Sequence, residues 1–130
     1  MRYLLDTTVL IDHALSRFGA DQLLLELFGE TGDIYTCDAA VVEALSSGTA
    51  DELRVIERLI QALEYVSTTP EAARWAAEFR RRRGRTSRRH LGDAIIAGVA
   101  WSLDATIVTR NPRDFEGQGV PVLAYGQTTA

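Results

Sequence analysis

The chain has 130 residues and a formal net charge of -4, and its fourteen basic residues are all arginine. Since a P-loop needs a lysine to reach nucleotide phosphates and Schiff-base catalysis needs a lysine amine, both mechanisms are excluded. The length predicts one domain over residues 1–130 with a single core. No apolar run approaches a membrane-spanning length, and we expect a cytoplasmic protein with a reduced, buried thiol at Cys37.

The first half of the chain alternates short apolar runs with amphipathic stretches. In chain order it predicts a strand over residues 2–6, a helix capped by Thr7 or Thr8, a helix with apolar residues over 23–28, a strand over 34–36, a helix capped by Asp38, and a helix over 53–63.

The second half continues this alternation. It predicts a strand over 65–67, a helix capped by Thr69 with Pro70 in its first position, a helix opened by Gly92 and Asp93, a strand over 105–109, a turn at Asn111 and Pro112, and a last strand over 120–123. Alternating strands and helices of this kind predict an α/β fold with a parallel sheet covered on both faces. In such sheets the functional crevice lies beyond the carboxyl ends of the strands.

Four carboxylates interrupt or closely follow apolar segments, where an unpaired charge is costly. They are Asp6, Glu43, Asp93 and Asp114. The strand ends and helix starts that carry them can meet at one edge of the sheet, where carboxylates gathered together favour a bound cation. Oxygen-rich sites favour Mg²⁺ or Mn²⁺ over zinc, so the pattern predicts an acidic site for one of these ions.

Each carboxylate also has a structural interpretation when taken singly. Asp6 could accept hydrogen bonds from neighbouring amides, Asp93 could stabilise the start of its helix, and Glu43 could face solvent. Asp38 is better explained as a helix cap, and Asp104, between a helix and a strand, is expected in an exposed turn.

Four motifs occur in the order of a known family. They are Leu4-Leu5-Asp6-Thr7-Thr8-Val9-Leu10-Ile11-Asp12, Val41-Val42-Glu43-Ala44-Leu45, Gly92-Asp93-Ala94-Ile95-Ile96-Ala97 and Ile107-Val108-Thr109-Arg110-Asn111-Pro112-Arg113-Asp114-Phe115. Together they resemble a PIN domain, and in length and spacing the chain is most similar to VapC toxins. The resemblance implies a three-layer α/β/α fold with a five-stranded parallel sheet. It also implies a Mg²⁺- or Mn²⁺-dependent endoribonuclease acting on tRNA, rRNA or mRNA, a VapB-type antitoxin and a homodimer.

The resemblance also assigns roles to individual residues. Asp6, Glu43 and Asp93 take the three core acidic positions, as metal-binding and catalytic residues. The usual fourth acidic position holds Asn111, and Asp114 is the nearest replacement. Thr8 stands where the family often has asparagine, so its hydroxyl is expected to orient Asp6 or a water.

A basic segment precedes Asp93. Its seven arginines are Arg80, Arg81, Arg82, Arg83, Arg85, Arg88 and Arg89. Such a cluster neutralises phosphates without reading sequence, so Arg85, Arg88 and Arg89, together with Arg110, are the predicted RNA contacts. The first arginines of the run could instead complement the dipole of a helix end.

Competing functions remain for a chain of this kind. A dehalogenase-type phosphatase is excluded, because position 8 holds Thr8 rather than an aspartate and no lysine is present. A related DNA-directed nuclease and a non-catalytic PIN-like RNA-binding module stay open. The leucine-rich and isoleucine-rich faces over 23–28 and 53–63 are expected mainly in the core, and one of them could form a dimer contact or an antitoxin groove.

Overall fold

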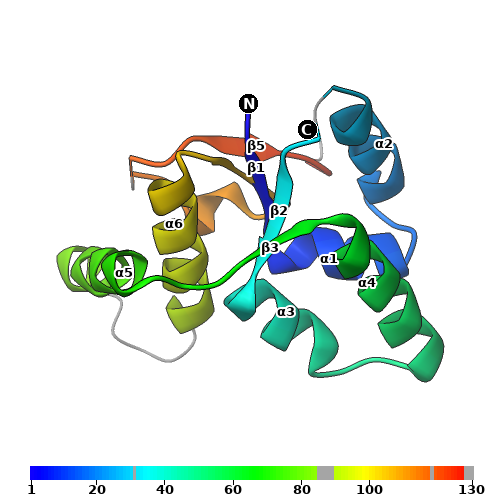
Figure 1. Ribbon diagram of the computed structural model, residues 1–130, viewed down its shortest axis with the longest axis horizontal. Coiled ribbons are helices and arrows are strands. Elements are labelled where there is room, and N and C mark those ends of the chain that lie inside the picture. Colours follow the sequence, from blue (N-terminus) through cyan, green and yellow to red (C-terminus); the bar gives the residue numbers. More distant parts are fainter. Residues whose placement is uncertain (31, 85–89, 118, 128–130) are drawn as a thin grey trace.

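The computed structural model describes residues 1–30, 32–84, 90–117 and 119–127, and these contain five strands and six α-helices (Figure 1). In chain order they are β1 (Tyr3–Leu5), α1 (Thr7–Ala14), α2 (Ala20–Glu30), β2 (Ile34–Cys37), α3 (Asp38–Leu45), α4 (Ala50–Ala62), β3 (Glu64–Val66), α5 (Pro70–Arg83), α6 (Leu91–Leu103), β4 (Thr106–Thr109), the short 3-10 helix η2 (Pro112–Asp114), and β5 (Val122–Ala124).

All neighbouring strands are parallel, and the sheet order is β3-β2-β1-β4-β5. Helices α5 and α6 lie on one side of this sheet, and α1, α2 and α4 lie on the other (Figure 1). The predicted three-layer α/β/α architecture is therefore confirmed. Because both faces are covered, the central strand is apolar throughout, and Leu4 and Leu5 have no exposed surface.

Two predicted helix caps are wrong. The first helix is capped by Asp6, whose Oδ1 accepts a hydrogen bond from the Thr7 amide at 2.7 Å. Asp38 is the first residue of α3 rather than its cap, and its carboxylate accepts hydrogen bonds from the Tyr65 hydroxyl and the Thr68 amide. The donors to Asp38 come from the strand beside β2 and the residues after it, so local sequence could not reveal them. The bond with Asp38 raises the pKa of Tyr65 to about 12.

Other local predictions are confirmed. Thr69 caps α5 and Pro70 occupies its first position. Asp104 lies in an exposed left-handed turn after α6. Cys37 is a buried free thiol, and burial raises its pKa to about 11, as expected for an inert core residue. None of the helices in the described part of the chain has the length and apolar character needed to cross a bilayer.

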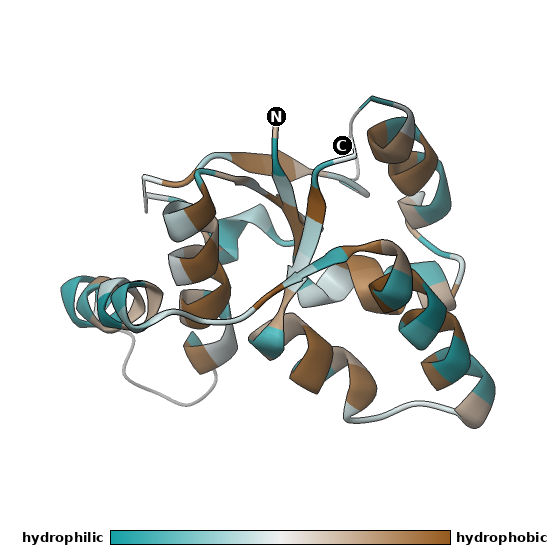
Figure 2. Cartoon of the chain, in the orientation of Figure 1, coloured by the Kyte–Doolittle hydropathy of each residue, from teal (hydrophilic) through white to brown (hydrophobic). Residues whose placement is uncertain are grey.

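Helix α6 is hydrophobic along most of its length, whereas α4 and α5 turn hydrophilic residues outward (Figure 2). The close approach of α5 to α6 depends on Gly98. A Cβ at this position would lie 2.4 Å from the backbone oxygen of Ala72 and 3.3 Å from the Cβ of Ala76. Since α6 begins at the sheet edge where the acidic residues lie, this contact also positions the candidate site.

We expect Gly98→Ala to lower the free energy of unfolding by about 1–3 kcal/mol, because the clash with a backbone oxygen forces the helices apart. Gly29→Ala in α2 is the matched control, since a Cβ there meets no atom within 4 Å. The control should be neutral or stabilising by up to about 1 kcal/mol. Urea unfolding monitored by circular dichroism measures both variants, and equal stabilities would argue against close α5–α6 packing.

Candidate metal centre

The candidate site lies where the strand order reverses. From β1 the chain moves outward through β2 to β3, and it returns to pair β4 with the other side of β1. The crevice of an open parallel sheet forms at the carboxyl ends of the strands at such a point. Asp6 directly follows β1, and Thr109 is the last residue of β4. Both residues therefore meet at this crevice.

Asp6 is only 3% exposed, and three uncharged groups hold its carboxylate. The Thr7 amide donates to Oδ1 at 2.7 Å, and the hydroxyls of Thr8 and Thr109 donate to Oδ2 at 3.2 and 2.7 Å. Burial raises the pKa of Asp6, these hydrogen bonds oppose the rise, and the charge of Asp114 adds to it. The Asp6 anion is thus well oriented, but its charge is poorly compensated by these contacts.

Thr8 links Asp6 to the loop after β4. Its hydroxyl accepts a hydrogen bond from the Arg110 amide at 3.1 Å while it donates to Asp6. The Thr8 hydroxyl thus contacts the Asp6 carboxylate, and its role in orienting Asp6 for a metal stays a prediction.

Glu43 approaches Asp6 from α3. It lies in the second turn of that helix, so the expectation that it sits in the first turn is wrong. Partial burial and the negative charge of Asp6 raise the pKa of Glu43. A Cβ at position 92 would lie 2.1 Å from Glu43 Oε1. Gly92 therefore leaves the space that the Glu43 carboxylate occupies beside the start of α6.

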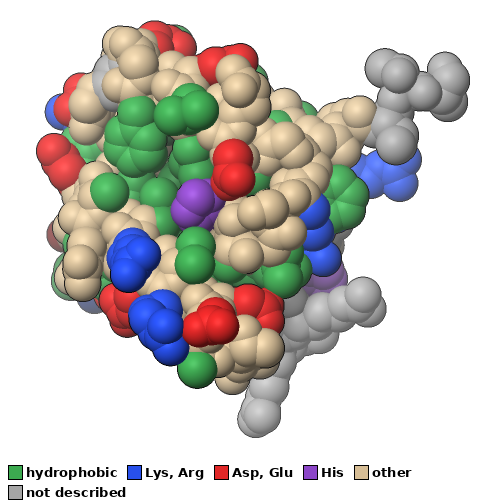
Figure 3. Space-filling model, turned by 90° about the vertical axis from the view of Figure 1, so that its right-hand side faces the viewer, with side chains coloured by type: hydrophobic (Ala, Val, Ile, Leu, Met, Phe, Trp, Pro, Cys, Tyr) green, Lys and Arg blue, Asp and Glu red, His purple; other side chains and the backbone are tan. Residues whose placement is uncertain are grey.

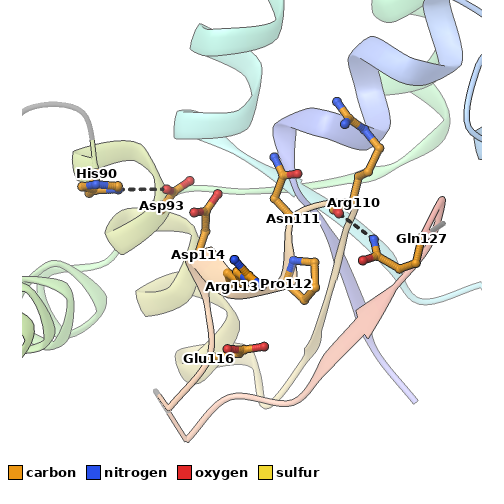
Figure 4. A pocket seen from close by; sticks show the side chains of 9 residues that line it. All are labelled: His90, Asp93, Arg110, Asn111, Pro112, Arg113, Asp114, Glu116 and Gln127. Atoms are coloured by element: carbon orange, nitrogen blue, oxygen red, sulfur yellow. Dashed lines mark hydrogen bonds and ion pairs between the residues drawn. The ribbon is translucent and has the colours of Figure 1, made fainter. Parts of the chain in front are cut away.

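Asp93 and Asp114 complete the group. Asp93 lies in the first turn of α6 as expected, and Asp114 ends η2. Figure 4 shows their carboxylates turned toward each other in a cavity of about 740 Å³, with His90 beside Asp93. One ligand atom from each of these three residues lies within 4.8 Å of the other two. We call Asp6, Glu43, Asp93 and Asp114 the acidic centre.

Asn111 lines the same cavity but is exposed, and its backbone amide donates to the Thr109 hydroxyl at 3.0 Å. Asp114, by contrast, adjoins Asp93 and acts electrostatically on Asp6. The geometry therefore favours Asp114 over Asn111 as the fourth acidic group.

A second buried carboxylate, Asp12, has a different environment that the sequence interpretation missed. It has no exposed surface and accepts hydrogen bonds from Arg17 Nε, Arg110 Nε and the Tyr125 hydroxyl, each at 2.8 Å. The sequence did offer a signal of this burial. Asp12 follows Val9 by three residues in the same helix, so the two side chains lie on one helix face, and Val9 is buried. We call Asp12, Arg17, Arg110 and Tyr125 the Asp12 cluster.

The Asp12 cluster bears on the predicted RNA contacts. Arg110 lines the cavity, but its Nε binds Asp12, and its guanidinium carbon lies 4.3 Å from the centre of the Phe18 ring. Arg85, Arg88 and Arg89 lie outside the described residues. Arg83 before them donates to the Glu116 backbone oxygen at 2.7 Å. Because Glu116 lines the cavity, this hydrogen bond joins the end of α5 to the cavity wall.

A parallel sheet with an acidic centre at its carboxyl edge defines a small α/β protein with a candidate metal site. Residues 3–118 match the PIN domain family, and the chain is 32% identical to Ribonuclease VapC19 of Mycobacterium tuberculosis over 86% of this chain and 90% of that protein. The chain belongs to the PIN-domain family, as its motifs predicted.

Solved structures agree on the fold. A VapBC2 complex from Rickettsia felis bound to a promoter DNA fragment matches with a TM-score of 0.76 and 18% identity, covering 95% of this chain and 98% of that one. A DNA-bound VapBC from Salmonella typhimurium matches with a TM-score of 0.76 and 22% identity over the same shares.

The Asp12 cluster generates a prediction about stability. Replacing Asp12 by Ala should lower the free energy of unfolding by roughly 2–4 kcal/mol, because the two arginines and the Tyr125 hydroxyl would lose their shared buried acceptor. Asp51→Asn is the control, since Asp51 pairs with Arg54 at the surface and exposed pairs contribute little. Chemical denaturation of both variants measures the difference, and an Asp12→Ala variant as stable as Asp51→Asn would contradict this assignment.

Proposed function

We propose that this protein is a divalent-metal-dependent endoribonuclease of VapC type, which hydrolyses RNA phosphodiester bonds in the cytoplasm and is neutralised by a VapB-type antitoxin. The observation that carries the proposal is the acidic centre, in which four carboxylates from separate segments converge on the crevice between β1 and β4. The VapC ribonuclease relative and the VapBC structures support the same assignment.

The residues of the acidic centre fit a Mg²⁺ or Mn²⁺ ion. Carboxylate oxygens are the ligands that these ions prefer. Burial raises the pKa values of both Asp6 and Glu43, with repulsion by Asp114 adding to the rise at Asp6 and repulsion by Asp6 adding to it at Glu43, and a nearby cation would offset these effects. When bound, such an ion supplies Lewis acidity, which makes a water more nucleophilic and offsets charge on the phosphodiester.

Within this proposal each acidic residue has a role. Asp6 and Asp93 bind the metal directly, and Glu43 either binds it or positions the attacking water. Asp114 fills the fourth position, with Asn111 next to it in the cavity. The donors from Thr8 and Thr109 hold the Asp6 carboxylate in one orientation before the ion arrives, which is the preorganisation that a metal site requires.

The antitoxin would bind on the face formed by α2 and α4. Figure 3 shows hydrophobic side chains gathered on this face among charged ones. On α2, Leu24 and Leu27 are buried, as expected for core residues, but Leu25 is 69% exposed and Phe28 is 41% exposed. Outward apolar residues of this kind support a protein contact, and we propose that the toxin is a homodimer in addition.

Asp6→Asn tests the catalytic assignment. The variant keeps an oxygen that can accept from the Thr7 amide, so its melting temperature without metal should not fall, while cleavage of a labelled RNA in Mn²⁺ should drop more than about 100-fold. Asp104→Asn in the exposed turn is the control and should cleave normally. Full activity of Asp6→Asn, or wild-type cleavage that persists in EDTA, would refute the assignment. RNA binding without any cleavage would favour the alternative of a non-catalytic PIN-like module.

A second experiment tests the basic segment. Replacing Arg85, Arg88 and Arg89 by Gln should weaken RNA binding and reduce the slope of log affinity against log salt by up to about 2, because three phosphate contacts would be lost. The charge-matched control replaces Arg54, Arg58 and Arg74. Fluorescence anisotropy on the Asp6→Asn background measures binding without cleavage, and an unchanged slope would count against this RNA contact.

A further inference from the structure

His90 is a residue of the cavity that neither the motifs nor the acidic centre uses. It immediately precedes α6, three residues before Asp93, so the helical turn brings the two side chains together. Its Nδ1 lies 3.7 Å from Asp93 Oδ2, and the two side chains are 30% and 22% exposed. His90 therefore faces the cavity from the same helix start as Asp93 (Figure 4).

The contact between these residues is not a hydrogen bond. A separation of 3.7 Å is too long, and among the described residues the buried Nδ1 of His90 has no hydrogen-bond partner. Leaving a buried ring nitrogen unsatisfied is unfavourable and needs an explanation. His90 also makes no capping hydrogen bond to α6, so a role in starting the helix does not account for its orientation.

The three side chains lie close enough together to share one ion after a small movement. Two adjacent ligands of an octahedral ion with bonds of about 2.1 Å lie roughly 3 Å apart, and opposite ligands lie about 4.2 Å apart. One ligand atom each from His90, Asp93 and Asp114 lie within 4.8 Å of one another. A small adjustment of side chains would place all three around a single cation.

We propose that His90 supplies a nitrogen ligand to a metal position that it forms with Asp93 and Asp114, and that this position selects first-row transition-metal ions over Mg²⁺. Imidazole suits transition metals, whereas Mg²⁺ strongly prefers oxygen. The inference rests on the proposed metal-dependent function and deepens it. Asp6 and Glu43 offer only oxygen ligands. The imidazole nitrogen would therefore make the position formed by His90, Asp93 and Asp114 chemically different from a position beside Asp6.

The experiment uses Mn²⁺ as a paramagnetic probe of the full chain without a histidine tag. Electron spin-echo envelope modulation should show the coupling of a directly bound ¹⁴N nucleus in the wild type. Protein labelled with ¹⁵N only at histidine should lose this signal and gain the ¹⁵N coupling. Labelling identifies the ligand as histidine without any mutation, and so the result does not depend on whether a variant folds.

Mutation then assigns the histidine. The chain contains only His13 and His90, and His13 contacts Asp21 at 2.6 Å between α1 and the start of α2. His13→Gln should retain the nitrogen coupling, whereas His90→Gln should lose it and bind Mn²⁺ less tightly, with its affinity for Mg²⁺ little changed. Calorimetric titration of each ion measures this change in preference.

The outcomes separate the inference from the proposed function. Mn²⁺ binding with no directly bound nitrogen, or nitrogen coupling that persists in His90→Gln, would overturn the role of His90 while leaving a carboxylate-bound ribonuclease intact. Absence of Mn²⁺ binding together with RNA cleavage that EDTA does not inhibit would overturn both.

Discussion

The Asp6 carboxylate is the group on which the rest of the site depends. It caps α1 through the Thr7 amide, and it joins β1 to β4 through the Thr109 hydroxyl. Burial and the charge of Asp114 raise the pKa of Asp6, and the charge of Asp6 in turn raises the pKa of Glu43. The fold therefore holds an anion in a place where its charge is unfavourable, which is the condition under which a cation binds most strongly.

The comparison with Asp12 explains why we assign a structural role to one buried aspartate and propose a metal-binding role for the other. Both carboxylates are almost fully buried and each accepts three hydrogen bonds. Two of the three donors to Asp12 are the cationic side chains Arg17 and Arg110, so its charge is balanced within the protein. The donors to Asp6 are neutral. Orientation without charge compensation is what a metal ligand needs.

The two carboxylates are also coupled through the loop after β4. Arg110 binds Asp12 with its side chain and the Thr8 hydroxyl with its backbone amide, and Thr8 in turn donates to Asp6. The chain from Arg110 then leads through η2 to Asp114. The Asp12 cluster thus fixes the start of the segment that carries Asp114. On the other side, the α5–α6 contact at Gly98 and the space at Gly92 fix the helix that carries Asp93.

From the sequence, the α/β class, the parallel sheet and each strand to within one or two residues could be predicted correctly, and four acidic residues could be proposed for the site. These follow from local patterns, because apolar runs, helical periodicity and a carboxylate at a strand end are each visible within a few residues. The partners of these residues came from the tertiary structure: Tyr65 for Asp38, the two arginines for Asp12, and His90 and Asp93 beside Asp114. These contacts join segments from different strands and helices, or depend on how a helix start is oriented over the crevice, and no local pattern fixes either.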